Sequence, residues 1–185
     1  MNLIVPFGSS ILGAIIGGAF LLGGQRWIKH EQSRHNARII LIFFLRKSHE
    51  LDRLINSYGE GVKIIMLDFN TDPYHEREQY LFTSINVERL EFIYQNVASI
   101  DNMKKSLINH VVQPDTTVSY GYLQSLQKSM ITILDNLKPF AYRSKSDLKK
   151  IDQALINLKQ SYEHFASSMP VNNFLLRLDQ QGSQK

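Results

Sequence analysis

The sequence YRSKSDLKK, residues 142–150, gathers basic side chains beside an aromatic ring at a predicted helix start. Ser146 is suited to cap that helix, and Asp147 offsets part of the unfavourable interaction between cations and the helix dipole. N–H groups at a helix start can bind phosphate together with cationic side chains, and a tyrosine ring can stack on a base. This basic cluster is a candidate nucleotide-binding site, with a solvated charged helix face as the alternative. It comprises Tyr142, Arg143, Lys145, Lys149 and Lys150.

The other titratable residues follow no known catalytic or metal-binding pattern. The six histidines occur without the HExxH spacing of zinc enzymes, and there is no cysteine to supply a thiolate ligand or a disulfide. The GEG at residues 59–61 lacks the further glycine and the lysine with which a P-loop holds phosphates. GxSxG and protein-kinase signatures are also missing from the sequence. We therefore expect no enzymatic activity, no metal and no cofactor.

The chain begins with a long apolar segment, residues 3–24, that has no ionisable side chain. As a helix its 22 residues extend about 33 Å, close to the roughly 30 Å of a bilayer's hydrocarbon core. A buried helix of a globular protein seldom has so long an uncharged run. A cleaved signal peptide needs basic residues before the run, and here there are none. The pattern predicts a transmembrane helix over residues 1–25, with these two readings as alternatives.

Positive charge is concentrated directly after the apolar segment. Residues 25–53 hold seven of the 21 Lys and Arg but three of the 17 Asp and Glu, so the net charge of +4 arises there. Basic residues on the C-terminal side of a span predict that this side is cytoplasmic. We expect a single-pass protein of the cell inner membrane, with its N-terminus outside, its C-terminus in the cytoplasm and Trp27 at the headgroup level.

Glycine is abundant in the apolar segment, although each glycine costs a helix in water about 1 kcal/mol relative to alanine. In lipid, helices associate through close backbone approach, which small residues permit. Two rows of small residues spaced by four therefore predict an oligomerisation face. A general abundance of glycine in membrane helices is the alternative. The rows are Ser9, Gly13 and Gly17, and Ser10, Ala14 and Gly18.

Basic side chains follow at helical spacing and form what we call the basic stripe. If the helix continues past Gly24, four of them lie on one face with a fifth beside them. These residues are Arg26, His30, Arg34, Arg38 and Lys29. Anionic lipids attract Lys and Arg by about 1 kcal/mol each near the surface, so we expect lipid contact from all but His30. A generic flank of positive charge predicts the same topology.

Apolar periodicity predicts helices in the rest of the chain. Residues 39–45 are too few to span a membrane and favour a core helix over about 34–57 that ends at two glycines, with a position along the membrane interface as the alternative. Four later segments place apolar residues on one helical face. They are 84–100 with Ser84 as cap, 102–112, 120–137 ending before Pro139, and 146–169 ending before Pro170.

The fold class expected is all-α, with one transmembrane helix that continues into a small antiparallel helical domain. Residues 62–67 are predicted as either helix or a short strand, and the candidate partner for a strand is TTVSYGY, residues 116–122. Four regions follow from these patterns. They are a transmembrane helix over 1–25, a basic juxtamembrane helix over 26–57, a cytoplasmic helical domain over 58–178 and a disordered tail over 179–185.

This layout resembles the small membrane effectors of bacterial antiphage systems. Among these are CRISPR-associated membrane proteins gated by cyclic oligoadenylate and the transmembrane effectors of retrons. The resemblance covers the layout and no motif, so it assigns no functional residue. It implies an inner-membrane oligomer whose activation stops growth or kills the infected cell. Independently of the resemblance, a membrane-anchored helical domain without catalytic residues is expected to act by binding and assembly. The cytoplasmic domain would sense a signal, such as a cyclic oligonucleotide, and rearrangement of a homo-oligomer would perturb the membrane. A membrane-anchored scaffold or inhibitor that holds a protein partner is the alternative.

Overall fold

The computed structural model describes residues 4–82, 85–109, 117–142 and 144–167, and side chains from residue 18 onward except those of residues 19, 60, 108 and 109. Throughout these residues the regular elements are helices, which confirms the all-α fold class. The helices are α1 (Ile4–Tyr58), α2 (Asp72–His75), α3 (Val87–Asn109), α4 (Tyr120–Ala141) and α5 (Lys145–Ser167). The 3-10 turns are η1 (Gly59–Gly61), η2 (Ile64–Met66) and η3 (Glu78–Tyr80).

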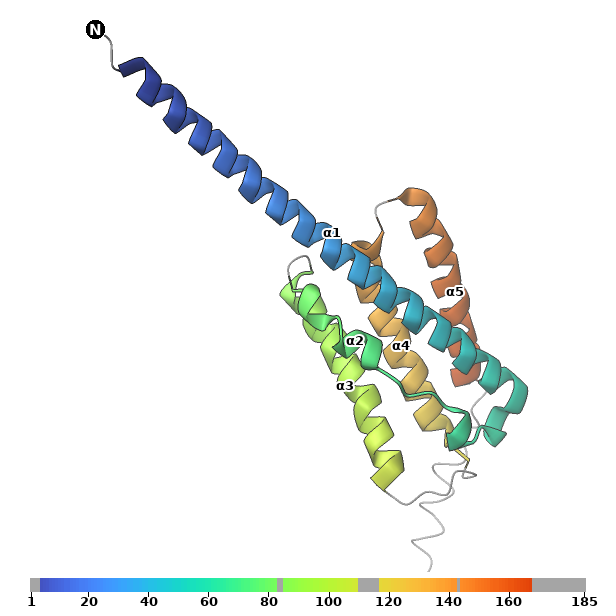
Figure 1. The fold of residues 1–185 in the computed structure, drawn as a ribbon. Helices are drawn as coiled ribbons and strands as arrows, with labels where there is room; N and C mark the ends of the chain where they lie inside the picture. Colours follow the sequence, from blue (N-terminus) through green and yellow to red (C-terminus); the bar gives the residue numbers. More distant parts are fainter. Residues whose placement is uncertain (1–3, 83–84, 110–116, 143, 168–185) are drawn as a thin grey trace, which may run out of the picture.

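Helix α1 is a single helix of 55 residues whose N-terminal part projects from the bundle (Figure 1). Residues 20–30 are exposed, whereas from Ser33 onward buried positions recur at helical spacing. The predicted core helix over 34–57 is confirmed as the second half of α1. The helix ends where Gly59 adopts a positive φ of 52°, which glycine reaches without the steric strain of a Cβ.

The apolar segment forms the start of α1. In the part of the chain that the structure describes, no helix is long and apolar enough to cross a membrane. Side chains 1–17, which include Ser9, Ser10, Gly13, Ala14 and Gly17, lie outside the described residues.

Helix α4 runs antiparallel to the other long helices and lies at the centre of the bundle (Figure 1). Near its start, Tyr122 shares a hydrogen bond of 3.2 Å with Ser106 at the end of α3. At the same end, the rings of Tyr120 and Phe165 pack edge to face with centroids 5.0 Å apart, which places the end of α5 beside the start of α4. The opposite end of α4 contacts the first buried turns of α1 through Arg38.

The apolar stripes predicted for α4 and α5 are confirmed as core. The buried residues of the α4 stripe are Leu123, Leu126, Met130, Ile133, Leu134 and Leu137. Of the predicted α5 stripe, Ile151, Leu155, Leu158 and Phe165 are buried, whereas Leu148 and Tyr162 are partly exposed. For α3 the apolar pattern predicts one buried face of Val87, Leu90, Ile93, Tyr94 and Val97. Leu90, Ile93 and Val97 are buried, but Val87 and Tyr94 are exposed, so this prediction is partly wrong. Val87 lies in the first turn of α3, and Tyr94 lines a groove between α3 and α4.

Several predicted helix ends differ from those observed. Pro139 lies within the last turn of α4, where its missing N–H removes one hydrogen bond near the helix end. The carbonyl of Ser144 accepts the first bond of α5, from Leu148 N–H at 3.0 Å, so Ser144 rather than Ser146 holds the cap position. The segments 84–100 and 102–112 belong to one helix, α3, and the predicted cap Ser84 lies outside the described residues.

Residues 62–67 form neither of the predicted elements in full. Lys63 makes a single antiparallel bridge to Thr117, and Val118 N–H donates to the Val62 carbonyl at 2.8 Å, so the predicted pairing segment is correct. No strand forms there because the next residues turn into η2 after one bridge. The segment is also attached to α1 by an ion pair between Asp68 and Lys47.

Tyr74 in α2 is buried and provides a test of this packing by pH. Burial raises the pKa of its hydroxyl from 10.0 to about 12, and the Glu78 carboxylate adds to the shift. Since the folded state holds this proton more tightly, the stabilisation is complete below pH 10 and is lost as the pH rises towards 12. We expect the free energy of unfolding to fall by about 2–3 kcal/mol over that range relative to Tyr74→Phe. Denaturant titrations of both proteins across this pH range measure the free energies of unfolding. If the two free energies fell in parallel with pH, the prediction would be contradicted.

Candidate functional site

The basic cluster lies where α4 ends and α5 begins. Tyr142 directly follows α4 and is half-buried, and the guanidinium of Arg38 lies 5.1 Å from the centre of its ring. Lys145, Lys149 and Lys150 are exposed on the first turns of α5, and no ion pair joins them to another described residue. Arg143 lies outside the described residues.

The contacts of Arg38 change the interpretation of two predicted sites. Its Nε donates a hydrogen bond to the carbonyl oxygen of Ala141, and its guanidinium covers one face of Tyr142. Arg38 therefore holds α1 to the end of α4, in place of the lipid contact expected from the sequence. That ring face of Tyr142 therefore makes a cation–π contact within the chain.

The rest of the basic stripe divides at the point where α1 enters the bundle. Arg34 pairs with Glu31 one turn earlier and is largely covered. Arg26 and Lys29 are exposed on the projecting part of α1, as lipid contact would require. The helical spacing thus predicts the shared face correctly. The bundle covers the part of that face that carries Arg34 and Arg38.

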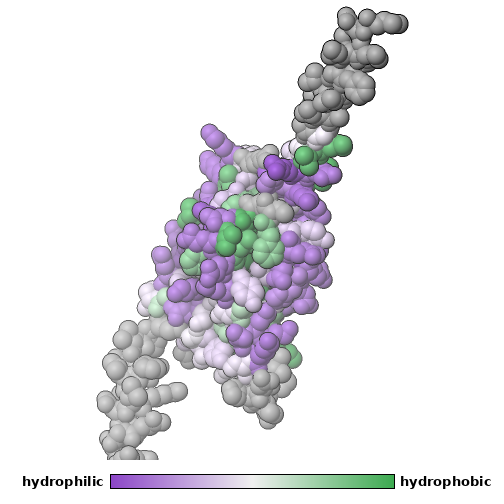
Figure 2. All heavy atoms as spheres, turned by 90° about the vertical axis from the view of Figure 1, so that its left-hand side faces the viewer, coloured by the Kyte–Doolittle hydropathy of each residue, from purple (hydrophilic) through white to green (hydrophobic). Residues whose placement is uncertain are grey.

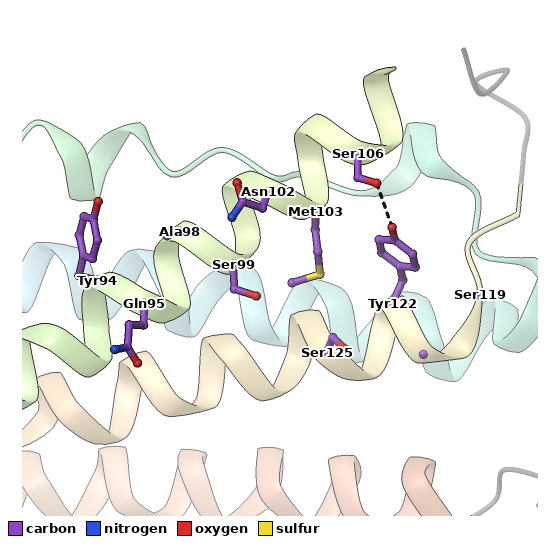
Figure 3. A pocket seen from close by; sticks show the side chains of 11 residues that line it. Tyr94, Gln95, Ala98, Ser99, Asn102, Met103, Ser106, Ser119, Tyr122 and Ser125 are labelled. Carbon is purple, nitrogen blue, oxygen red and sulfur yellow. Dashed lines mark hydrogen bonds between the residues drawn. The ribbon is translucent and has the colours of Figure 1, made fainter. Parts of the chain in front are cut away.

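A groove between α3 and α4, with a volume of about 780 Å³, is a site that the sequence did not indicate. Figure 3 shows Tyr94 at one end and the hydrogen-bonded pair Ser106 and Tyr122 at the other. Between these ends, hydroxyl and amide groups line it together with Ala98 and the side chain of Met103. Its lining residues are Tyr94, Gln95, Ala98, Ser99, Asn102, Met103, Ser106, Ser119, Gly121, Tyr122 and Ser125.

The chemistry of the α3–α4 groove favours an uncharged occupant. None of its lining residues carries a formal charge, so a phosphate group would find no cation there. Ala98, Ser99, Gly121 and Ser125 are small, which suits close approach of a partner helix or of a flat polar ligand. The groove lies at the start of α4, whereas the basic cluster lies beyond its other end, so the two do not form one site.

An aromatic patch lies beside α2 and the start of α3. Phe82 is 69% exposed and Val87 is 78% exposed, and they border a hollow of about 360 Å³. Figure 2 shows hydrophobic residues gathered on this side of the bundle among hydrophilic ones. Exposed side chains of this size in a contiguous patch are typical of an interaction surface.

His75, in α2, joins two segments of the chain. His75 Nε2 lies 2.9 Å from Asp101 Oδ2, and Thr71 donates its hydroxyl to the same carboxylate. Glu78 lies 3.6 Å from the other ring nitrogen of His75. These contacts attach α2 to α3. Over the described residues, no group of three or more His, Asp or Glu could hold a metal ion.

Comparison with protein-family models, with curated proteins and with solved structures finds no match for this chain. Its function is therefore inferred from the arrangement of its own residues.

Proposed function

We propose that this chain is a single-pass inner-membrane protein whose cytoplasmic helical domain senses a ligand or partner and passes the resulting change to a membrane-embedded oligomer. The observation that carries the proposal is the continuity of α1. One helix includes both the apolar segment and a core helix of the domain, without a break between them. A shift of α1 within the bundle would therefore move the apolar segment as one rigid body.

The exposed residues of the projecting part of α1 support membrane anchoring. Phe20, Leu21 and Leu22 are 63–78% exposed, and Trp27 is 62% exposed. Large apolar side chains in such a row need a covering partner, and the described bundle does not supply one. A bilayer would cover the first three, while indole at residue 27 is favoured at the headgroup level.

Buried polar groups on α1 and α4 support movement between these helices. The side-chain polar atoms of Ser33, Ser48 and Gln127 are buried and have no hydrogen-bond partner among the described atoms. A buried polar group without a partner costs about 1–3 kcal/mol. A second arrangement of α1 against α4 that pairs these groups would recover that energy, so ligand binding could stabilise it at modest cost.

The α3–α4 groove is our choice for the sensing site, because it borders α4, which packs on α1. The resemblance to antiphage effectors suggests growth arrest as the output. A cyclic oligonucleotide at the basic cluster is the second candidate signal, and there Arg38 already covers one ring face of Tyr142.

Alanine insertions after Gln25 test the coupling. Each residue turns a helix by 100°, so seven alanines restore its phase to within about 20° whereas two turn it by about 200°. If α1 transmits a rotation, growth arrest on overproduction is retained with seven alanines and lost with two. Growth curves measure the effect, and immunoblots of membranes show that both variants are present in equal amounts. Equal arrest by both variants would contradict transmission through α1.

The uncharged α3–α4 groove also favours a second function, a scaffold that holds a helical partner at the membrane. A scaffold would tolerate either insertion, because anchoring does not depend on helix phase. It would lose its partner when the groove is filled by Ala98→Trp. The insertions and the groove variant together separate the two functions.

A further inference from the structure

Contacts between the long helices define which end of the bundle faces the apolar segment. Arg38 contacts Ala141, so the end of α4 lies where α1 leaves the bundle. Arg89 at the start of α3 lies 5.7 Å from the ring centre of Phe140 at the end of α4. An ion pair between Lys138 and Asp152 places the start of α5 beside them. We call this the exit end of the bundle, and Figure 1 shows it on the side of the projecting part of α1.

The exit end lies close to the proposed membrane boundary. The last residue of the apolar segment is Gly24, and among the described side chains of α1, from residue 18 onward, the first buried one is Ser33. Nine residues of helix separate them by about 14 Å. The headgroup zone occupies about 5–8 Å of this, and salt screens charge over about 8–10 Å, so side chains at the exit end are within electrostatic reach of lipid.

The exit end carries the two kinds of side chain that bind a membrane surface, namely exposed apolar side chains and exposed lysines. Val87 is an exposed apolar residue in the first turn of α3, and Phe82, which precedes α3, is exposed and borders the same hollow as Val87. Lys145, Lys149 and Lys150 are exposed at the start of α5. Over the first six residues of α3 and of α5, the cations are Arg89 and these three lysines, and the anions are Glu88, Glu91 and Asp147, so the cations exceed the anions by one.

We infer that the exit end is a second membrane contact, in which Lys145, Lys149 and Lys150 bind anionic headgroups and Phe82 and Val87 reach the interface. Each lysine near an anionic leaflet contributes about 1 kcal/mol, so the three together are significant beside the anchor. The inference rests on the proposed anchoring by α1. It gives the basic cluster a lipid surface as its partner, and it fixes the tilt of the bundle relative to the membrane.

The absence of cysteine and the single tryptophan make this arrangement measurable in the full chain. A fluorophore on Ser146→Cys reports from the exit end, and one on His164→Cys reports from the other end of the same helix. The protein is placed in vesicles of phosphatidylcholine alone or with phosphatidylglycerol, which contain a lipid with a quencher at the headgroup. Quenching of Trp27 by brominated lipid reports independently on the anchor.

In vesicles with phosphatidylglycerol, we expect headgroup quenching at position 146 to exceed that at position 164 severalfold. The double change Lys149→Glu and Lys150→Glu should reduce it to the level of position 164, and high salt should do the same. The matched control is Lys104→Glu with Lys105→Glu, which reverses two exposed lysines at the far end of α3 and should leave quenching unchanged. Circular dichroism verifies that the helices persist in each variant.

The two readouts separate failure of this inference from failure of the anchor. Quenching of Trp27 without quenching at position 146 would overturn the second contact and leave the anchor standing. Quenching at position 146 that is equal in both lipid mixtures, or unchanged by the glutamate substitutions, would overturn the role of the lysines. An unquenched Trp27 would overturn the proposed anchoring and this inference with it.

Discussion

Replacing Phe44 by alanine will lower the free energy of unfolding by about 3–5 kcal/mol. Its side chain is 1% exposed on the inner face of α1, and its ring packs edge to face on Phe43 with centroids 5.3 Å apart. Removal of the ring loses the transfer free energy of its buried atoms and leaves a cavity against α4. Denaturant titration of the full chain in detergent, followed by circular dichroism, measures the change.

The matched control for Phe44 is Ile42→Ala on the same helix. Ile42 is 55% exposed, so its loss should change the free energy of unfolding by no more than about 0.5 kcal/mol. This contrast also decides between the two readings of residues 39–45. If the segment lay along a membrane interface instead of in the core, both substitutions would have similar small effects on unfolding in detergent, which would contradict the observed packing.

Replacing Gly13 and Gly17 together by isoleucine should remove most of the oligomer. The β-branched side chains prevent the close backbone approach that small residues permit, and a loss of about 1–2 kcal/mol per helix contact corresponds to roughly a tenfold fall in association. Crosslinking in native membranes measures the fraction of oligomer, and growth arrest on overproduction should decline in parallel.

Gly23→Ile is the control for that pair. Residue 23 lies about 80° from Gly13 around the helix, on the side away from the second row of small residues. An added Cβ at Gly23 meets no atom within 4 Å, so the substitution does not disturb the protomer itself. If Gly23→Ile reduced crosslinking as strongly as the double variant, association would not depend on the predicted face.

The long helices could be predicted because their core residues recur at helical spacing. In α4, Leu126, Met130, Ile133 and Leu137 form an apolar stripe that only a helix places on one side, and burial follows from it. The second half of α1 was predictable for the same reason. Helix ends were harder, because a proline in a last turn costs little and two serines compete for the cap of α5.

Residues 62–82 show why the rest could not be predicted. Besides a few buried side chains such as Phe69 and Leu81, this segment is held by isolated polar contacts with distant residues, such as Asp68 with Lys47 and Thr71 with Asp101. Such contacts leave no periodic signal. The basic stripe has the same limit, since spacing places Arg38 on a face but does not show that this face meets Ala141.

The α3–α4 groove had no signal in the sequence. Its residues are small and uncharged, and none of them has a side chain whose chemistry stands out by itself. They form a site because α3 and α4 pack antiparallel, which brings Ser99 and Ser125 to the same hollow. By contrast, the basic cluster was visible as a run of charges, but its position at the exit end required the fold.

The length of α1 makes it a lever as well as an anchor. From Ser33, where the described part of α1 begins to pack on the bundle, back to Ile4, the helix extends about 43 Å. A tilt of α1 by about 10° about Ser33 would displace Ile4 by about 7–8 Å. That distance approaches the spacing of two packed helices, so a small repacking around α4 is mechanically sufficient to change which neighbours meet across the bilayer.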